Sequence, residues 1–350
     1  MATKMVAKYR IIKNTNDIVQ VLKIGYFSPI VTWYFPDRMG VGKVFIKIKK
    51  IINRIRGKTI ESLLKLSNPP LPLPKNATEA ELFNFVTSVR VADAPEEEMR
   101  NYSTHDFKRF IYTLDLAADQ SGQCLELGAN PYFTTMLLKH FTTLKLSLAN
   151  YFGLEVQDGI QEVTYRSFKD HTPLRESLNF KHFNIEAENF PYEDALFDVV
   201  IYAEIIEHLT VDPCRVLREL KRVLKPNGVL ILTTPNVARL ENVARLMSGA
   251  NIYDPYSGYG PYGRHNREYT QQELIELLAY VGFDCERSFT ADVHHNATEQ
   301  FVDITKIYKI LEFRKPDLGQ YIFIKARNTE HNSTKLPSWL FRSYPKELLE

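Results

Sequence analysis

The stretch QCLELGANPYFTT, residues 123–135, joins a short apolar run to a glycine and then to a helix-forming segment. The run predicts a buried strand, and residues 132–141 predict a helix. Between them, Gly128 can adopt a positive φ that lets a ligand approach the backbone closely, and Pro131 suits the first turn of a helix. Glu126 ends the strand, so we expect it to face the crevice where open α/β sheets bind ligands.

The glycine content of this turn limits the ligands that it can hold. A dinucleotide site needs the pattern G-x-G-x-x-G, with the pyrophosphate at the helix N-terminus, whereas Ala129 and Asn130 follow Gly128 here. A dehydrogenase of that type is therefore disfavoured, and a ligand without a pyrophosphate fits better. The alternative is an ordinary strand–helix turn that binds nothing.

Strands and helices alternate after this stretch, as in a doubly wound α/β sheet. Asp212 and Pro213 predict a helix start, and Thr78 and Thr270 each precede a glutamate by three residues, which is the pattern of a capping box. Residues 153–180 are polar and show no clear pattern. Further helices are expected at 103–118 and 237–247. The seven strands expected are 124–127, 143–148, 181–185, 197–203, 229–233, 285–289 and 321–326.

Composition indicates a folded protein. The 350 residues are 44% apolar and 12% aromatic, which allows a substantial core and excludes global disorder. The three cysteines stand far apart, which is neither a disulfide framework nor a zinc pattern and suits a reducing compartment. We see no secretory signal and no apolar run long enough to span a bilayer. We therefore expect a cytoplasmic protein, with membrane association left open.

Charge is unevenly distributed along the chain. Residues 1–58 hold 13 of the 44 basic residues and 2 of the 42 acidic residues, which gives them a net charge of +11. The remainder holds 31 basic and 40 acidic residues, a net charge of −9. Within residues 43–56, apolar and basic positions recur at helical spacing. Such a helix could lie on an anionic membrane or bind nucleic acid. Alternatively, it packs on the rest of the chain or on a dimer partner and leaves a solvated basic face.

These features divide the chain into five parts. A basic, mostly helical extension is expected at residues 1–67 and a stiff proline-rich linker at 68–76. A helical lead-in is expected at 77–120, the sheet domain at 121–327 and a C-terminal tail at 328–350.

Five motifs in order along residues 115–327 resemble class I S-adenosylmethionine-dependent methyltransferases. They are LELG (125–128), EAENFPY (186–192), FDVVIYAEIIEHL (197–209), LKRVLKPNGVL (220–230) and TTPN (233–236). The resemblance implies a seven-stranded Rossmann-like methyltransferase sheet, methyltransferase activity and S-adenosyl-L-methionine as the cofactor. This cofactor has no pyrophosphate, which is consistent with a turn that holds one glycine.

The resemblance also implies eight cofactor-binding residues at the ends of the first four strands. Glu126 and Gly128, with neighbouring Ala129, would line the methionine end of the cofactor, and Asn150 would contact the ribose. Glu186 and Ala187 would lie beside the adenine, and Ala203 and Glu204 would face the sulfonium. Asn150 is an amide at a position where the family usually has an acid.

Two motifs bring further titratable side chains to the same sheet edge. Glu204-x-x-Glu207-His208 closes the fourth strand, and His265 lies in GRHNREYT, residues 263–270, before a helix. Two carboxylates and two imidazoles could bind Mg²⁺ or a similar cation, and the arrangement resembles the metal site of small-RNA ribose methyltransferases. Alternatively, His208 or His265 is a metal-free base, or the histidines only pack or face the cofactor.

A loop at residues 251–263 holds four tyrosines and three glycines. Tyrosine offers a stacking face and a hydroxyl, which suit sugars or aromatic acceptors; alternatively, the loop packs its own aromatic rings. The loop and the motif after it resemble bacterial methyltransferases of polysaccharide and glycoconjugate assembly, and the first motif resembles ubiquinone-pathway O-methyltransferases. His294 and His295 are a further candidate pair, but adjacent side chains of a strand point to opposite faces.

Three functions follow from these observations. The first is O-methylation of a sugar or another small hydroxylated acceptor. The second is methylation of RNA ribose, with the basic extension on phosphates; it ranks lower because that extension lacks interleaved aromatic residues for base stacking and the rest of the chain is acidic. The third is a cofactor-binding scaffold without turnover that docks to a membrane or a partner through residues 43–56.

Overall fold

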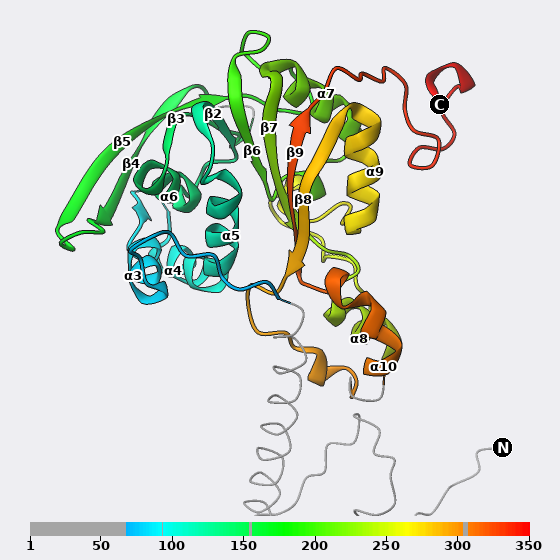
Figure 1. Ribbon diagram of the computed structural model, residues 1–350, viewed down its shortest axis with the longest axis horizontal. Coiled ribbons are helices and arrows are strands. Elements are labelled where there is room, and N and C mark those ends of the chain that lie inside the picture. Colours follow the sequence, from blue (N-terminus) through cyan, green and yellow to red (C-terminus); the bar gives the residue numbers. More distant parts are fainter. Residues whose placement is uncertain (1–67, 93, 154–155, 304–306) are drawn as a thin grey trace, which may run out of the picture. The chain divides into compact units, whose positions relative to one another are not determined.

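The computed structural model describes residues 68–350 except 93, 154–155 and 304–306. The predicted extension at 1–67, with its basic helix at 43–56, lies outside the described residues. A nine-stranded sheet in the order β1-β4-β5-β3-β2-β6-β7-β9-β8 forms the centre of the described part (Figure 1). Its strands are β1 (Arg90–Val91), β2 (Ser121–Leu127), β3 (Thr143–Asn150), β4 (Gly159–Arg166), β5 (Pro173–His182), β6 (Phe197–Ala203), β7 (Leu224–Pro235), β8 (Phe283–Ala291) and β9 (Tyr321–Asn328).

The pairing of the strands confirms the predicted doubly wound α/β class. Strands β5, β3, β2, β6 and β7 run parallel in that order, and β9 lies antiparallel between β7 and β8. The carboxyl ends of the parallel strands therefore meet at one edge of the sheet, where such folds bind ligands.

The prediction of seven strands was wrong by two in the described part. Strands β4 and β5 form an antiparallel hairpin out of the polar region for which the sequence showed no pattern, and β1 pairs with β4. β4 is mostly half-buried and β5 is mostly exposed, so both lack the apolar run that marks a buried strand. The strand expected at 181–185 was misplaced for the same reason, since β5 ends at His182.

Eight helices are assigned in the described residues. They are α3 (Glu79–Val86), α4 (Glu96–His105), α5 (Phe107–Ala117), α6 (Phe133–Phe141), α7 (Pro213–Val223), α8 (Leu240–Met247), α9 (Gln271–Val281) and α10 (Tyr308–Leu311). The single helix expected at 103–118 is two helices that break at Asp106. The start of α7 is confirmed, because Asp212 accepts a hydrogen bond from the backbone of Cys214.

The two expected capping boxes differ. Thr78 and Glu81 make both reciprocal hydrogen bonds at the start of α3, so that box is confirmed. At α9, Thr270 accepts from the Glu273 amide, but the Glu273 carboxylate pairs with Arg267. The second capping box is therefore only half formed, because the Glu273 carboxylate pairs with Arg267 and not with the backbone of Thr270.

Two apolar clusters cover the two faces of the sheet. Adjacent residues of the central strands alternate between them: Cys124 faces the cluster under α3, α5 and α6, whereas Leu125 faces the cluster under α7 and α9. Figure 1 shows α5 and α6 on one side of the sheet and α7 and α9 on the other. Leu336 and Phe341 of the C-terminal tail are buried in the second cluster. None of the helices in the described residues combines the length and the hydropathy needed to cross a membrane.

Candidate cofactor and metal site

The turn after β2 confirms the positive φ expected at its glycine. Gly128 has a φ of 63°, and a Cβ there would lie 3.2 Å from Cδ1 of Ile205. The expected role of Pro131 was wrong: α6 begins two residues later, after Tyr132, which caps it in the left-handed conformation with a φ of 68°. Pro131 therefore belongs to the turn and not to the helix.

The side chain of Asn150, at the end of β3, holds this turn in place through two hydrogen bonds. Its Oδ1 accepts a hydrogen bond from the Asn130 amide at 2.8 Å, and its Nδ2 donates to the Tyr132 hydroxyl at 3.0 Å. Because that hydroxyl itself donates to Gln161, it needs a donor as its second partner. An aspartate could not supply one, which gives a reason for the amide at this position.

A pocket opens beside this turn, at the carboxyl ends of β2, β3, β5 and β6. Its walls are largely apolar with a few polar groups, which suits a small organic ligand. All eight residues predicted to bind the cofactor are described, and three of them, Gly128, Asn150 and Glu204, line this pocket. The other lining residues are Leu127, Ala149, Tyr151, Phe183, Asn184, Ile185, Ile205, His208, Leu209 and Tyr262. The segment 183–185 was missed because the third strand was placed over it.

The remaining five predicted cofactor residues, Glu126, Ala129, Glu186, Ala187 and Ala203, lie outside this lining. Glu126 is buried and accepts a hydrogen bond from the Thr135 hydroxyl at 2.7 Å. Burial raises the pKa of its carboxyl group to about 8. Glu186 holds the loop after β6, since its carboxylate accepts from the amides of Thr210 and Val211 at 2.7 and 3.0 Å.

Glu204 follows β6 in a strained backbone conformation, with a φ of 57°. Its Oε1 accepts from the Thr233 hydroxyl at 2.8 Å and lies 3.9 Å from Nη1 of Arg109, which is buried in α5. Burial raises the pKa of Glu204, and the charge of Arg109 opposes that rise. Non-glycine residues in such conformations cluster at functional sites.

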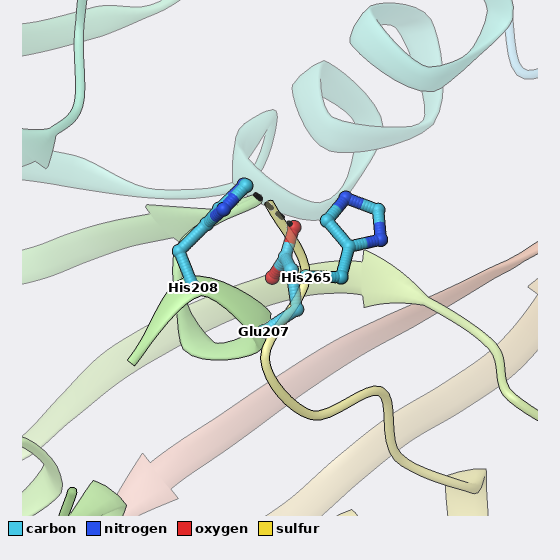
Figure 2. A group of neighbouring side chains, drawn as sticks. All are labelled: Glu207, His208 and His265. Carbon is cyan, nitrogen blue, oxygen red and sulfur yellow. Dashed lines mark ion pairs between the residues drawn. The ribbon is translucent and has the colours of Figure 1, made fainter. Parts of the chain in front are cut away.

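Three of the four predicted metal ligands form a compact group. One ligand atom each of Glu207, His208 and His265 lies within 4.8 Å of the others, and Figure 2 shows the three side chains gathered together. The fourth predicted ligand, Glu204, is not a member. It faces Thr233 and Arg109 instead. Within the described ranges no second group of this kind occurs.

The carboxylate of this group is incompletely partnered. Glu207 has no exposed surface, and its Oε2 accepts from the Thr234 hydroxyl at 2.8 Å. Its Oε1 is buried without a hydrogen bond and lies 3.8 Å from Nε2 of His208. Such an atom is costly to bury unless something binds it.

The two imidazoles present matching nitrogens. Nδ1 of His208 donates to the backbone oxygen of Arg264 at 2.9 Å, and Nδ1 of His265 donates to the Glu268 carboxylate at 2.8 Å. These acceptors place the proton on Nδ1, so each neutral ring carries a lone pair on Nε2. Metal-binding histidines show this arrangement, in which the second nitrogen donates to a carboxylate or a carbonyl group.

Burial and neighbouring charges set the protonation of the group. Burial lowers the pKa of His208 and raises the pKa of Glu207. Burial also opposes protonation of His265, but its hydrogen bond to Glu268 and the charge of Glu207 outweigh that and raise its pKa. Glu268 is in turn paired with Arg239. At neutral pH, protons therefore compete with any cation for His265 and Glu207.

Backbone hydrogen bonds join the two segments that carry the group. Glu207 and His208 lie in the short helix η1 (Ile206–His208), and the Glu207 carbonyl accepts from the Asn266 amide at 2.7 Å. The Asn266 side chain donates to the His208 carbonyl at 2.9 Å. Asn266 thus fixes the position of its neighbour His265 relative to η1, and the sequence did not reveal this role.

Two further features were candidates for the site: the pair His294 and His295, and the tyrosine-rich loop 251–263. His294 stacks on His105 with ring centroids 3.8 Å apart, and His295 pairs with Glu299; neither belongs to the metal-ligand group. In the loop 251–263, Tyr262 lines the pocket, whereas Tyr253, Tyr256 and Tyr259 are 83%, 92% and 90% exposed. The alternative that this loop packs its own rings was therefore wrong for these three.

Comparisons with known proteins indicate the family of part of the chain. Residues 125–232 match the family model described as a methyltransferase domain. A probable S-adenosylmethionine-dependent methyltransferase of Mycolicibacterium smegmatis is 33% identical over 120 residues, which are 34% of this chain and 40% of that protein. Another, from Mycobacterium tuberculosis, is 36% identical over 93 residues, 27% of this chain and 29% of that protein. The match thus spans less than half of these curated relatives.

Solved structures resemble the chain more distantly. A protein in complex with the Haloferax volcanii Trm112 methyltransferase activator is 14% identical and covers 68% of this chain and 96% of its own, with a TM-score of 0.43. A geranyl diphosphate C-methyltransferase of Streptomyces coelicolor is 12% identical and covers 68% and 82%, with a TM-score of 0.40. The family match and the curated relatives identify a class I S-adenosylmethionine-dependent methyltransferase domain in this chain. S-adenosylmethionine is the cofactor that these relatives imply.

Proposed function

We propose that the chain is an O-methyltransferase for a sugar or another small hydroxylated acceptor, and that Glu207, His208 and His265 hold a divalent cation beside the acceptor hydroxyl. One observation carries this proposal: His208 lines the pocket at the carboxyl ends of the strands and also belongs to the candidate metal-ligand group. A hydroxyl is a poor nucleophile, so it needs a base or a metal ion that lowers its pKa.

The residues present fit a cation. Oε1 of Glu207 is buried without a hydrogen bond, and one ligand atom each of Glu207, His208 and His265 lies within 4.8 Å of the others. Two imidazoles and one carboxylate suit Mn²⁺ or Zn²⁺ better than Mg²⁺, which prefers oxygen ligands. Such an ion would supply Lewis acidity for the acceptor oxygen. Glu268 and the Arg264 carbonyl orient the two rings, and the neutral His208 can accept a proton at Nε2 where no ion is bound.

The cofactor would supply a methyl group already activated by its positive sulfur. The chain then has to align the reacting atoms and exclude water, because proximity accounts for much of the catalytic effect. Gly128 and Asn150 line the pocket at the turn after β2, and Glu204 lines it just after the carboxyl end of β6. The apolar walls between them exclude water.

Two observations support a sugar over an RNA ribose. The exposed tyrosines of the loop 251–263 offer stacking faces beside the pocket. Residues 59–350 have a net charge of −9, which repels a polyanion.

The test is methyl transfer by the full chain, supplied with S-adenosylmethionine and Mn²⁺. Acceptors are free sugars, nucleotide sugars, oligosaccharides and short RNA. We expect methylated sugar, loss of product in His265→Asn, and full activity in His295→Asn, a matched control in which another glutamate-paired histidine is changed. Product on RNA alone would favour ribose methylation. Binding of S-adenosylhomocysteine without product from any acceptor would favour the scaffold.

A further inference from the structure

A buried arginine of helix α5 lies next to a residue that lines the pocket. Arg109 is 3% exposed, and its guanidinium group contacts two carboxylates. Its Nε donates to Oδ1 of Asp106 at 3.3 Å, and its Nη1 lies 3.9 Å from Oε1 of Glu204. Its Nη2 donates to the hydroxyl of Tyr102. Because a buried charge is costly unless it is paired and hydrogen-bonded, these partners hold the guanidinium group in one position.

The Glu204 carboxylate uses only one of its oxygens for contacts of this kind. Its Oε1 accepts a hydrogen bond from the Thr233 hydroxyl at 2.8 Å and lies beside Arg109. Its Oε2 has no hydrogen-bond partner among the residues that the structure describes, yet it is not one of the atoms sealed from solvent. Since Glu204 lines the pocket, this second oxygen is open to a ligand there.

The cluster around Arg109 has more negative than positive charge. One guanidinium group serves two carboxylates, and His105 lies 3.4 Å from Asp106, the carboxylate that does not line the pocket. Of the described residues that line the pocket, Glu204 alone is acidic, and none is a lysine or an arginine. The pocket therefore presents an incompletely neutralised carboxylate, which favours a ligand with a positive charge at that point.

The cofactor and its product differ in charge at the reacting sulfur. S-adenosylmethionine has a positive sulfonium group, whereas the S-adenosylhomocysteine that remains after methyl transfer has a neutral thioether. The two molecules otherwise differ only by the methyl group. A carboxylate beside the sulfur attracts the first molecule and not the second, and this attraction is stronger in a partly buried pocket than in water.

We propose that Arg109 is a positioning residue that holds the Glu204 carboxylate toward the sulfonium group of S-adenosylmethionine. The pocket thereby prefers the cationic cofactor to its neutral product, which favours release of the product after each turnover. Without the guanidinium group, Glu204 would be an unpaired anion in a largely buried place, which is costly. We then expect its carboxyl group to turn away or to lose its charge. This preference depends neither on the acceptor nor on cation binding by the metal-ligand group.

The experiment is calorimetric titration of the full chain with S-adenosylmethionine and with S-adenosylhomocysteine, in a chelator that removes metal ions. The measured quantity is the Kd for S-adenosylhomocysteine divided by the Kd for S-adenosylmethionine. We expect Glu204→Gln and Arg109→Met each to lower this ratio about tenfold, mainly by weakening the binding of S-adenosylmethionine. Arg109→Lys, which keeps the charge, should restore part of the ratio.

A matched control changes another arginine that pairs with an aspartate of α5. Arg287 lies 2.7 Å from Asp115 and does not line the pocket, so Arg287→Met should leave the ratio unchanged. Melting temperatures show which variants fold, and Arg109→Gln replaces Arg109→Met if the latter does not.

Two results would overturn the proposal. In one, Glu204→Gln weakens both ligands by the same factor, so that Glu204 forms part of the pocket wall and its charge has no role. In the other, Glu204→Gln lowers the ratio, but a folded variant with a neutral side chain in place of Arg109 keeps the wild-type ratio. The carboxylate would then need no support from Arg109.

Discussion

Two buried glutamates of this domain make a natural comparison. Glu126 on β2 and Glu207 in η1 are both almost completely buried, and each accepts a hydrogen bond from one threonine hydroxyl, at 2.7 and 2.8 Å. Burial raises the pKa of both. They differ in their remaining oxygen: Glu207 leaves Oε1 fully buried without a partner, beside two imidazoles, whereas Glu126 leaves no such atom.

We propose that this difference separates a carboxyl group with a structural role from a metal ligand. Glu126 tolerates burial because its raised pKa keeps it protonated at neutral pH and Thr135 donates a hydrogen bond to it, so it needs no cation there. Glu207 combines an unsatisfied oxygen with two oriented nitrogens, and a cation would satisfy all three at once. Burial and a raised pKa alone therefore do not identify the metal site, and the neighbours of each carboxyl group do.

The largest expected effect is on cation binding. Glu207→Gln should abolish calorimetrically detectable Mn²⁺ binding, because it replaces the anionic ligand by a neutral amide. Glu126→Gln, the matched change at the other buried carboxyl, should bind Mn²⁺ as the wild type does. Equal loss in both variants would mean that a general disturbance of the sheet edge, and not ligation, explains the result.

The second effect concerns stability and pH. The folded pKa of Glu126, about 8, lies above its ordinary value, so the stability contributed by its neutral carboxyl is complete in acid and is lost as pH rises through 8. In Glu126→Gln this loss should be absent, and the variant should gain about 3–5 kcal/mol relative to the wild type between acid and pH 9. Urea unfolding at several pH values measures this. Parallel pH profiles for the two proteins would contradict it.

A smaller effect is expected at the residue that orients His265. Glu268→Gln should weaken Mn²⁺ binding about 10–100-fold, and it should also lower the pKa of His265, because the hydrogen bond that His265 donates to the Glu268 carboxylate is lost. The pH at which cation affinity falls should therefore move to lower values. Calorimetric titration between pH 6 and 8 tests both parts, and unchanged affinity and pH dependence would remove Glu268 from the site.

The smallest effect comes from the two threonines that partner the glutamates. Thr135→Val and Thr234→Val each remove one hydrogen bond, and each should cost about 1 kcal/mol of unfolding free energy. Only Thr234→Val should also alter Mn²⁺ affinity, since of the two glutamates only Glu207 is a proposed ligand. Denaturant unfolding paired with calorimetry separates the two roles, and a change in Mn²⁺ affinity in Thr135→Val would contradict the comparison.

The fold could largely be predicted from sequence where strands are buried. β6 is a nearly continuous apolar run and β2 ends in a short one, and these patterns located both strands. The β4–β5 hairpin could not be found, because β4 is mostly half-buried, β5 is mostly exposed, and neither carries such a run. The start of α6 was misplaced since the left-handed conformation of Tyr132 follows from its local contacts and not from its residue type.

The candidate site could be predicted only as a set of residues. The spacing of Glu204, Glu207 and His208 did not show which carboxylate would turn toward His265. The strained backbone at Glu204 directs that side chain to Thr233 and Arg109, and Arg109 lies nearly a hundred residues earlier in the chain. Likewise, the roles of Asn266 and Glu268 depend on hydrogen bonds between segments that are distant in sequence.

The most direct test of the metal site is anomalous diffraction from crystals of the full chain soaked with Mn²⁺ and S-adenosylhomocysteine. We predict one anomalous peak in contact with Oε1 of Glu207 and with Nε2 of His208 and of His265, beside a nucleoside in the pocket that Gly128 and Asn150 line. A nucleoside in that pocket with no peak at the three side chains, at a saturating Mn²⁺ concentration, would contradict the account.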